Sequence, residues 1–150
     1  MTASTDEQNF AHAYDARIYY ADTDFSGVVY YARYLEYLER GRSDLLHKCG
    51  VRHRDLLAGE GSADGSPLAW VVRRIEVDYR GSAQIEDTIR VYTGIAEARG
   101  ARITMVQRIT LNDRTILDAT VQAALITLEG RPVRIPRPWL ERFESLVTAP

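Results

Sequence analysis

The sequence predicts an α+β fold in which one long helix is covered by one largely antiparallel sheet. Residues 29–49 show the apolar spacing of a long amphipathic helix. Between residues 74 and 128 the chain shows repeated alternation of apolar and polar residues, as strands do. The order of strand, long helix and then a run of strands is typical of a fold in which one sheet buries one helix.

The composition indicates a globular protein that does not bind nucleic acid. The chain has 150 residues, of which 45% are hydrophobic and 27% charged, and its net charge is −2. Its one cysteine, Cys49, excludes an internal disulfide. The N-terminal segment lacks the basic and apolar regions of a signal peptide, and no segment reaches the roughly 18 apolar residues of a membrane span. We therefore expect a cytoplasmic protein.

The first strand and a loop precede the long helix. Residues 1–13 should form a flexible tail, so that a single domain occupies residues 14–150. Residues 16–21 are expected to form the first strand, and residues 22–27 form a loop of turn-favouring residues. This loop delivers two aspartates to the start of the helix.

The long helix should begin within residues 29–32 and end near Cys49, because Gly50 is a stop signal. Gly41 weakens this helix unless another element packs closely against it, and a sheet wrapped round the helix would explain it. One buried face is predicted from residues spaced by four, three and four positions, namely Tyr34, Leu38, Gly41 and Leu45.

Four further strands and a short helix are predicted in the second half of the chain. A flexible loop over residues 59–66 precedes them. The strands are expected at residues 74–79, 89–95, 103–111 and 116–128, with hairpin turns at 98–100 and 112–113 and a final helix over 136–146. The segment 116–128 is the longest and most apolar, so we expect it to be the central strand.

The segment from Arg17 to Leu46 is the most informative part of the chain. A strand-like run leads to Asp22 and Asp24, and a Ser-Gly turn, two valines and the helix follow. A carboxylate is thus delivered to a loop just ahead of a helix N-terminus. Free backbone N–H groups and the helix dipole favour the negative charge that develops there when a carbonyl is attacked.

The run YYADTDFSGVVYYARYLEYLERGR resembles the hot-dog-fold acyl-CoA thioesterases of the 4-hydroxybenzoyl-CoA thioesterase type, and it is most similar to the branch associated with the Tol-Pal cell-envelope system. The run VVRRIEVDYRGSAQIEDTIRVYT resembles the same family's second strand, the turn after it and the third strand. The resemblance covers nearly all of residues 14–146. It implies an enzyme that hydrolyses an acyl- or aroyl-CoA to free acid and CoA, with one central helix wrapped by a five-stranded, mostly antiparallel sheet.

The resemblance also implies roles for individual residues. Asp24 is the catalytic carboxylate, as general base or as nucleophile, and the Tyr31 backbone N–H polarises the thioester carbonyl. The Tol-Pal-associated branch usually has a histidine at the position of Tyr31, whereas the hydroxybenzoyl branch has tyrosine. No metal or redox cofactor is implied. Substrate contacts are expected from Gly27, Val28, Tyr30, Tyr34, Arg73 and Arg74.

Several of these residues also have structural interpretations. An aspartate ahead of a helix often serves as an N-cap or closes an Asx-turn, and Asp22 is interpreted as a loop hydrogen-bonder that orders the turn. Glu36 and Glu39 are rival acids, although their pairing with Arg40 and Arg42 favours a solvated face.

The remaining reactive groups show no arrangement for chemistry. Cys49 has no adjacent base and is interpreted as an idle thiol, and His47 and His53 lack a metal-ligand spacing. Further arginines that could meet the phosphates of CoA are Arg131, Arg134 and Arg137.

A lone domain of this kind leaves a sheet edge and one sheet face exposed. We therefore expect a homodimer or homotetramer that takes acyl-CoA, and the resemblance implies an association with Tol-Pal or lipid metabolism. A hot-dog dehydratase would need a histidine beside its acid, and a DNA-binding acyl-CoA sensor would need an added helix-turn-helix. The alternative left open is a non-catalytic acyl-CoA-binding or envelope-associated scaffold protein.

Overall fold

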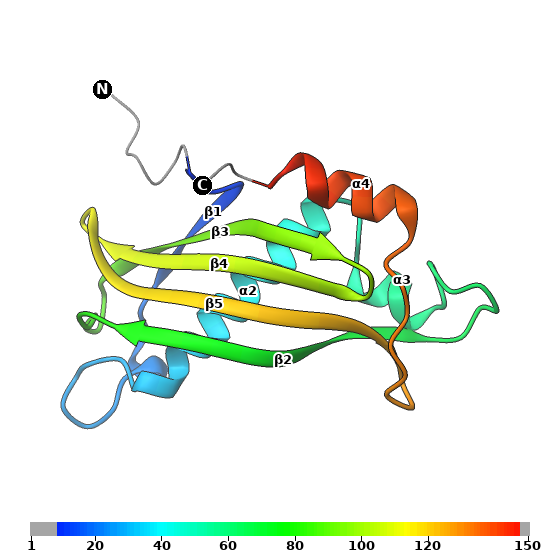
Figure 1. Ribbon diagram of the computed structural model, residues 1–150. Coiled ribbons are helices and arrows are strands. Elements are labelled where there is room, and N and C mark those ends of the chain that lie inside the picture. The colour runs from blue at the N-terminus through cyan, green and yellow to red at the C-terminus, as the bar shows by residue number, and fades with distance from the viewer. Residues whose placement is uncertain (1–8, 148–150) are drawn as a thin grey trace.

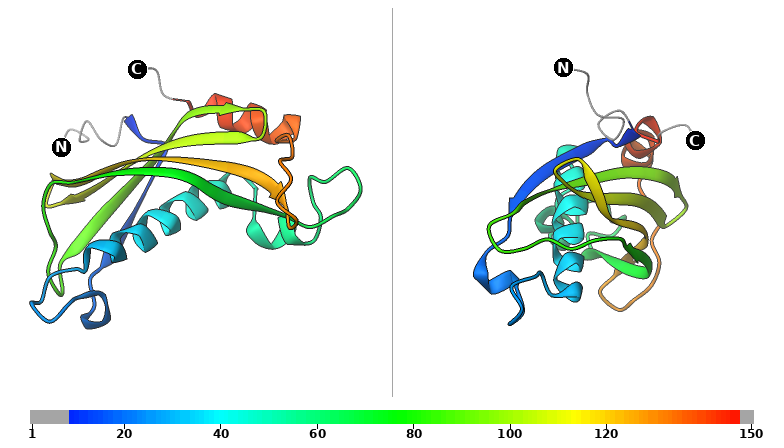
Figure 2. Two further views of the ribbon diagram at one scale, coloured as in Figure 1. Left: turned by 60° about the horizontal axis from the view of Figure 1, so that its bottom comes forward. Right: turned by 90° about the vertical axis from the view of Figure 1, so that its left-hand side faces the viewer.

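The computed structural model describes residues 9–147 and shows a five-stranded sheet that curves around one long helix (Figures 1 and 2). The strands are β1 (His12–Arg17), β2 (Leu68–Tyr79), β3 (Thr88–Arg99), β4 (Arg102–Leu111) and β5 (Arg114–Thr127). The helices are α2 (Tyr34–Lys48), α3 (His53–Leu57) and α4 (Arg137–Ser145), with short 3₁₀ helices η1 (Tyr20–Asp22) and η2 (Tyr31–Arg33). The predicted α+β class and the final helix are confirmed.

The sheet has the strand order β1-β3-β4-β5-β2, and every neighbouring pair is antiparallel. The longest strand, β5, lies second from one edge, so the prediction that residues 116–128 form the central strand was wrong. Two successive hairpins join β3, β4 and β5, and this connection places β4 between the other two. The edge strands are β1 and β2, and β2 has no partner on its outer side within residues 9–147.

Helix α2 lies against the inner face of the sheet (Figure 2), and all four residues predicted for its buried face are buried. The glycine in this face has a steric reason. A Cβ on Gly41 would lie 2.8 Å from Thr93 Oγ1 and 3.2 Å from Gln107 Nε2, atoms of β3 and β4. The predicted close approach is confirmed, and it brings the helix backbone within reach of buried polar side chains on the sheet.

The first strand begins earlier than predicted. It starts at His12 and not at residue 16, so residues 12 and 13 belong to the sheet and not to the tail. Residues 1–8 of the expected tail lie outside the described part of the chain. After Ile18 the chain turns into η1, because the Asp22 carboxylate accepts the Tyr19 N–H at 2.9 Å. A local hydrogen bond thus overrides the strand propensity of two tyrosines.

The ends of α2 and the two hairpin turns follow the prediction closely, whereas β2 begins at Leu68, well before the predicted residue 74, and the short helix α3 was not predicted. Gly50 ends α2 with φ +80°, and η2 runs directly into α2, so the helical backbone begins at Tyr31 as expected. Asn112 and Asp113 have positive φ values of 50° and 65°, which suit a tight hairpin. The other hairpin turns at Gly100, slightly later than predicted. Within residues 9–147, no helix is long and apolar enough to span a bilayer.

Candidate active site

Asp24 opens a tight hairpin turn between η1 and η2. The Gly27 N–H donates to the Asp24 carbonyl at 3.1 Å, and the Asp24 N–H donates to the Val28 carbonyl at 2.9 Å. Gly27 has φ +85°, and the position of a Cβ there has no atom within 4 Å. This glycine is therefore explained by its positive φ and not by a close approach. The turn brings Asp24, Gly27 and Val28 together.

One oxygen of the Asp24 carboxylate is held by the turn. Asp24 Oδ1 accepts the Ser26 N–H at 2.8 Å and the Ser26 hydroxyl at 2.5 Å, which is the Asx-turn anticipated as a structural role. The Ser26 hydroxyl, and after it the Ser26 backbone N–H, lower the pKa of Asp24. The Val28 backbone N–H also acts on the carboxylate and lowers its pKa. The carboxylate lies at the surface in its ionised form, and the hydrogen bonds of the turn fix its orientation.

The backbone N–H of Tyr31 is the hydrogen-bond donor that complements the Asp24 carboxylate. The Tyr30 N–H donates to the Asp22 carbonyl at 3.2 Å and the Arg33 N–H donates to the Tyr30 carbonyl at 2.8 Å, but the Tyr31 N–H has no acceptor within residues 9–147. This N–H lies at the positive end of the helix dipole. The Tyr79 hydroxyl donates to the Tyr31 carbonyl at 2.9 Å and anchors the helix start to the end of β2.

Asp22 orders the loop, as interpreted from the sequence. Its carboxylate accepts a backbone N–H of the loop and lies 3.8 Å from Arg33 Nε. Arg33 Nη1 also contacts Glu36 Oε2 at 2.6 Å, so the predicted pairing of Glu36 with Arg40 was wrong. Arg40 instead lies over the ring of Tyr37, 5.5 Å from its centroid. Arg33 thus ties the loop to the first turn of α2.

The aromatic residues of this region divide into buried and exposed groups. Tyr34 is only 2% exposed, and its hydroxyl accepts the Ala83 N–H at 2.9 Å, so it supports the loop from within the core. Tyr30 and Tyr31 are 49% and 62% exposed, and the centroids of their rings lie 4.9 Å apart. Tyr79 joins them, 6.2 Å from the Tyr31 ring. An apolar surface therefore flanks the carboxylate loop at the end of β2.

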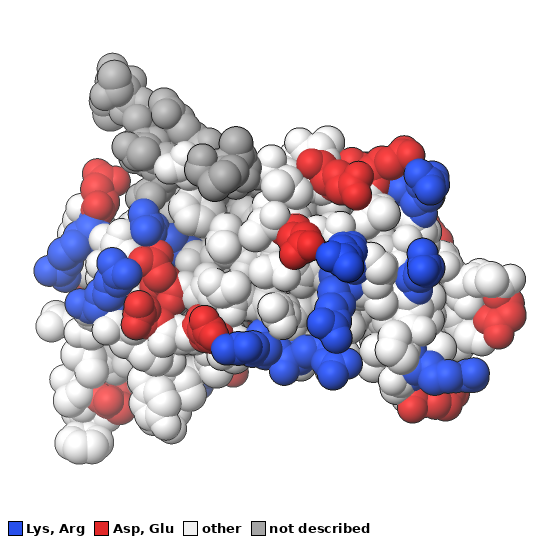
Figure 3. Space-filling view, viewed as in Figure 1, with Lys and Arg blue, Asp and Glu red and all other residues white. Residues whose placement is uncertain are grey.

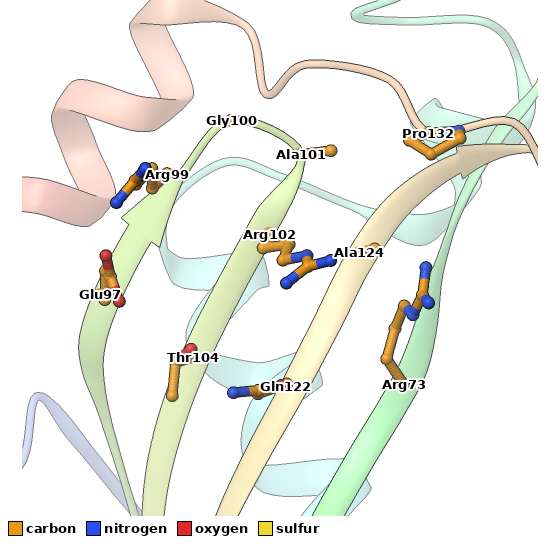
Figure 4. A pocket seen from close by; sticks show the side chains of 10 residues that line it. All are labelled: Arg73, Glu97, Arg99, Gly100, Ala101, Arg102, Thr104, Gln122, Ala124 and Pro132. Carbon is orange, nitrogen blue, oxygen red and sulfur yellow. The ribbon is translucent and has the colours of Figure 1, made fainter.

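Arg73 and Arg74 lie elsewhere, near the middle of β2, where a bulge shifts the register. Arg74 pairs with Glu76. Arg73 lines a cavity of about 530 Å³ on the outer face of the sheet together with Arg99 and Arg102 (Figure 4). Basic side chains gather over this face (Figure 3). In a single chain these arginines do not join the Asp24 loop, which lies toward the opposite end of the sheet (Figure 1).

Two residues that matter at the site were missed in the sequence. Ser26 follows Asp24 by two positions, and this Asp-x-Ser spacing is itself a signal for an Asx-turn. Arg42 was expected on the solvated face with Glu39, but its Nη1 donates to Gln107 Oε1 at 3.0 Å. Arg42 lies four residues after buried Leu38, at the border of the buried face, where a long apolar stem can follow the helix inward.

Comparison with known proteins identifies the family. Residues 19–143 match the family model of the thioesterase-like superfamily. The chain belongs to this superfamily. It is 35% identical over 135 residues to the acyl-CoA thioesterase YbgC of Haemophilus influenzae, a match that covers 89% of this chain and 95% of that protein. It is 31% identical over 131 residues to the acyl-CoA thioester hydrolase YbgC of Escherichia coli, covering 86% of this chain and 92% of that protein.

Solved structures of the superfamily have the same fold. A probable thioesterase from Bartonella henselae is 44% identical, with a TM-score of 0.78 over 83% of this chain and 98% of its own. A thioesterase from Thermus thermophilus, solved with coenzyme A and Zn, has a TM-score of 0.78 over 95% of this chain and 99% of its own, at 21% identity. The hot-dog fold expected from the two sequence motifs is confirmed.

We expect Ser26→Ala to raise the pKa of Asp24. The Ser26 hydroxyl is the largest cause of the lowered pKa, and alanine leaves only backbone donors. A lowered pKa keeps the carboxylate ionised down to more acidic pH, so its loss moves the protonation step upward in pH. A carbon-detected NMR titration of the Asp24 carboxyl measures this shift. Ser145→Ala, at an exposed serine of α4, is the control, and an unshifted titration in Ser26→Ala would contradict the assignment.

Proposed function

We propose that this protein hydrolyses acyl-CoA thioesters to a free acid and CoA, with Asp24 and the Tyr31 backbone N–H as its catalytic groups. One observation carries the proposal: an ionised surface carboxylate and, among residues 9–147, a backbone N–H without an acceptor at a helix N-terminus belong to the same short loop. The two YbgC relatives, at 35% and 31% identity, are named as acyl-CoA thioester hydrolases and support the substrate class.

Asp24 can open the thioester in two ways. As a general base it takes a proton from water, and the hydroxide adds to the carbonyl carbon. As a nucleophile its Oδ2 bonds to that carbon, and water then hydrolyses the mixed anhydride. On either route the C–S bond breaks, and the CoA sulfur leaves as thiolate and takes up a proton. The Tyr31 N–H donates to the carbonyl oxygen as negative charge develops on it.

Substrate contacts are proposed on both sides of this centre. Gly27, Val28 and Tyr30 would form the wall beside the thioester, with Tyr34 supporting them from the core. Arg73 and Arg74 would meet the phosphates of CoA, a role that suits the planar guanidinium. The Arg73 cavity on the outer sheet face supports this role, and its place near the middle of edge strand β2 puts it beside the seam proposed next.

A second copy of the chain completes the site. Strand β2 is an edge strand, and it exposes Val71, Val72 and Tyr79 at 39%, 44% and 45%. An unpaired apolar edge of this length is a template for strand pairing. If two β2 strands pair antiparallel about their middles, the start of one lies next to Tyr79 of the partner subunit. Because the Tyr79 hydroxyl is hydrogen-bonded to the Tyr31 carbonyl, this pairing would place the catalytic loop of each subunit against β2 of the partner subunit.

The oligomeric state and the cellular compartment of the protein are also part of the proposed function. The protein would work in the cytoplasm as a homodimer or homotetramer, in association with the Tol-Pal system or lipid metabolism. The single cysteine is in keeping with a reducing compartment. Cell fractionation, followed by co-purification with the tagged protein, tests the compartment and the association.

A thiol-release assay over a panel of acyl-CoAs tests the reaction. Release of one free thiol for each thioester consumed supports hydrolysis. Stoichiometric binding of acyl-CoA without thiol release would instead identify a non-catalytic acyl-CoA-binding or scaffold protein.

We expect Tyr31 to act through its backbone and not through its hydroxyl. Tyr31→Phe should keep most of the activity, whereas Tyr31→Pro removes the N–H and should lower kcat by about 10²–10³-fold. Tyr30 has φ −61° and ψ 131°, the conformation that a residue before proline adopts, so the backbone accommodates the change. Steady-state kinetics of the purified variants provide the measurement.

Tyr31→Ala is the matched control for the proline variant, because it loses the ring and keeps the N–H. Its kcat should lie well above that of Tyr31→Pro. Equal losses in the two variants would assign the effect to the ring, and a loss of about a hundredfold in Tyr31→Phe would make the hydroxyl catalytic.

A further inference from the structure

A small cavity lies between α2 and the inner face of the sheet, below the β2 edge. Its volume is about 110 Å³, less than the roughly 150 Å³ of an apolar protein cavity that holds benzene. Most of its lining is apolar, from Leu46, Trp70, Val72, Ile103, Met105 and Ala123. Val72 is aligned with Ala123 and Ala123 with Ile103 across three strands, so these side chains share the inner face. The cavity therefore suits a short, largely apolar group.

Arg42 brings a positive charge to this apolar cavity. Its Nη1 donates to Gln107 Oε1 at 3.0 Å. Gln107 is 2% exposed, and its Nε2 donates to the Leu38 carbonyl at 2.8 Å and to Thr93 Oγ1 at 3.0 Å. These two bonds fix the amide with its oxygen toward Arg42. Gly41 packs closely against Gln107 Nε2 and Thr93 Oγ1, so the acceptor oxygen that Gln107 presents to the guanidinium has a defined position.

The cavity offers donors that the described chain does not satisfy. Arg42 has no carboxylate within 4.0 Å among residues 9–147, although Glu39 is close enough to act on it through charge. Glu39, which also lines the cavity, accepts the Ser43 hydroxyl at Oε1 at 2.7 Å, and Ser43 Oγ lies 2.8 Å from His53 Nε2. Trp70, which lines the same cavity, has a buried indole N–H without a partner. A partly buried guanidinium normally finds an anion or several acceptors.

The proposed dimer connects this cavity to the catalytic loop. Trp70 and Val72 lie in the first half of β2, at the edge where a second β2 would pair. Antiparallel pairing brings Tyr79 of the partner subunit to this edge, together with the loop that carries the partner's Asp24. A thioester held at that loop would direct its acyl group into the cavity.

We propose that Arg42 selects substrates with a short acyl group that ends in a carboxylate. The apolar walls hold the methylene groups, the cavity length limits them to a few carbons, and the guanidinium forms a charge-assisted hydrogen bond with the terminal carboxylate. Arg42 is thus a specificity-determining residue, and this assignment rests on the proposed thioesterase function and dimer.

The test compares kcat/KM for succinyl-CoA and butyryl-CoA, whose acyl chains have the same number of carbons. The wild-type protein should favour succinyl-CoA, and Arg42→Met should reduce this preference by about tenfold or more, because a charge-assisted bond is lost. Arg42→Lys keeps the charge and should recover part of the preference. A third substrate, 3-hydroxybutyryl-CoA, separates a need for negative charge from a need for any oxygen acceptor.

Arg40→Met is the matched control, because Arg40 lies on the same helix over Tyr37 and does not line the cavity. Its substrate ratio should equal that of the wild type. Equal losses on both substrates in Arg42→Met, or a wild-type preference for butyryl-CoA, would overturn the assignment and leave Arg42 as a brace between α2 and β4. If Arg42→Met fails to fold, the wild-type ratio and Arg42→Lys decide. Hydrolysis of no acyl-CoA at all would instead contradict the proposed function.

Discussion

Asp24→Asn should lower kcat by at least 10²–10⁴-fold while the protein remains folded, because an amide is neither a base nor a nucleophile. The asparagine carbonyl can still accept the bonds from Ser26, so the turn is retained. Thiol release measures the rate, and circular dichroism with thermal melting checks the fold. The effect is expected on kcat, since the carboxylate acts in the chemical step.

Asp22→Asn is the control for the loss of a negative charge in the same loop. The side-chain carbonyl of the introduced asparagine would still accept the Tyr19 N–H, and Asp22 has a structural role, so we expect a loss of less than about tenfold. Near-normal turnover in Asp24→Asn would contradict the assignment. In that case Glu36 and Glu39 become the acids to test.

Val71→Asp should convert the assembly into monomers and abolish turnover. Val71 is an exposed residue of the edge strand, and the symmetry of a dimer would bring the new charge into the seam twice. Light scattering should report a mass at or above twice 17.0 kDa for the wild type and a mass near 17.0 kDa for the variant. Activity that returns at high protein concentration would show that the subunits themselves are intact.

Ala96→Asp supplies the control, because it places the same charge at an exposed position of β3, separated from β2 by β4 and β5. This variant should keep the wild-type mass and activity. A fully active monomer, in the wild type or in Val71→Asp, would overturn the shared site even if Asp24 proved catalytic.

The local features of this protein were predicted from the sequence alone, because they depend on short-range chemistry. The apolar spacing of α2, the stop at Gly50 and the hairpin at Asn112 and Asp113 all follow from residues close together in the chain. The same is true of the loop that joins Asp24 to Tyr31, whose motif also pointed to the family. Each of these features is determined by residues that are close to it in the sequence.

The tertiary structure decided what depends on residues far apart in the chain. Strand β5 was expected at the centre of the sheet because it is the most apolar strand. Apolar content indicates burial, which β4 and β5 share, but it does not indicate the order of the strands. Arg42 was expected in solvent because its partner, Gln107, is 65 residues away on β4. Tyr34 is buried in the core, where its hydroxyl accepts the backbone N–H of Ala83, a residue that follows β2 and is 49 positions away in the chain. Sequence spacing determines which face of an element is buried, whereas the packing of one element on another determines which polar groups meet there.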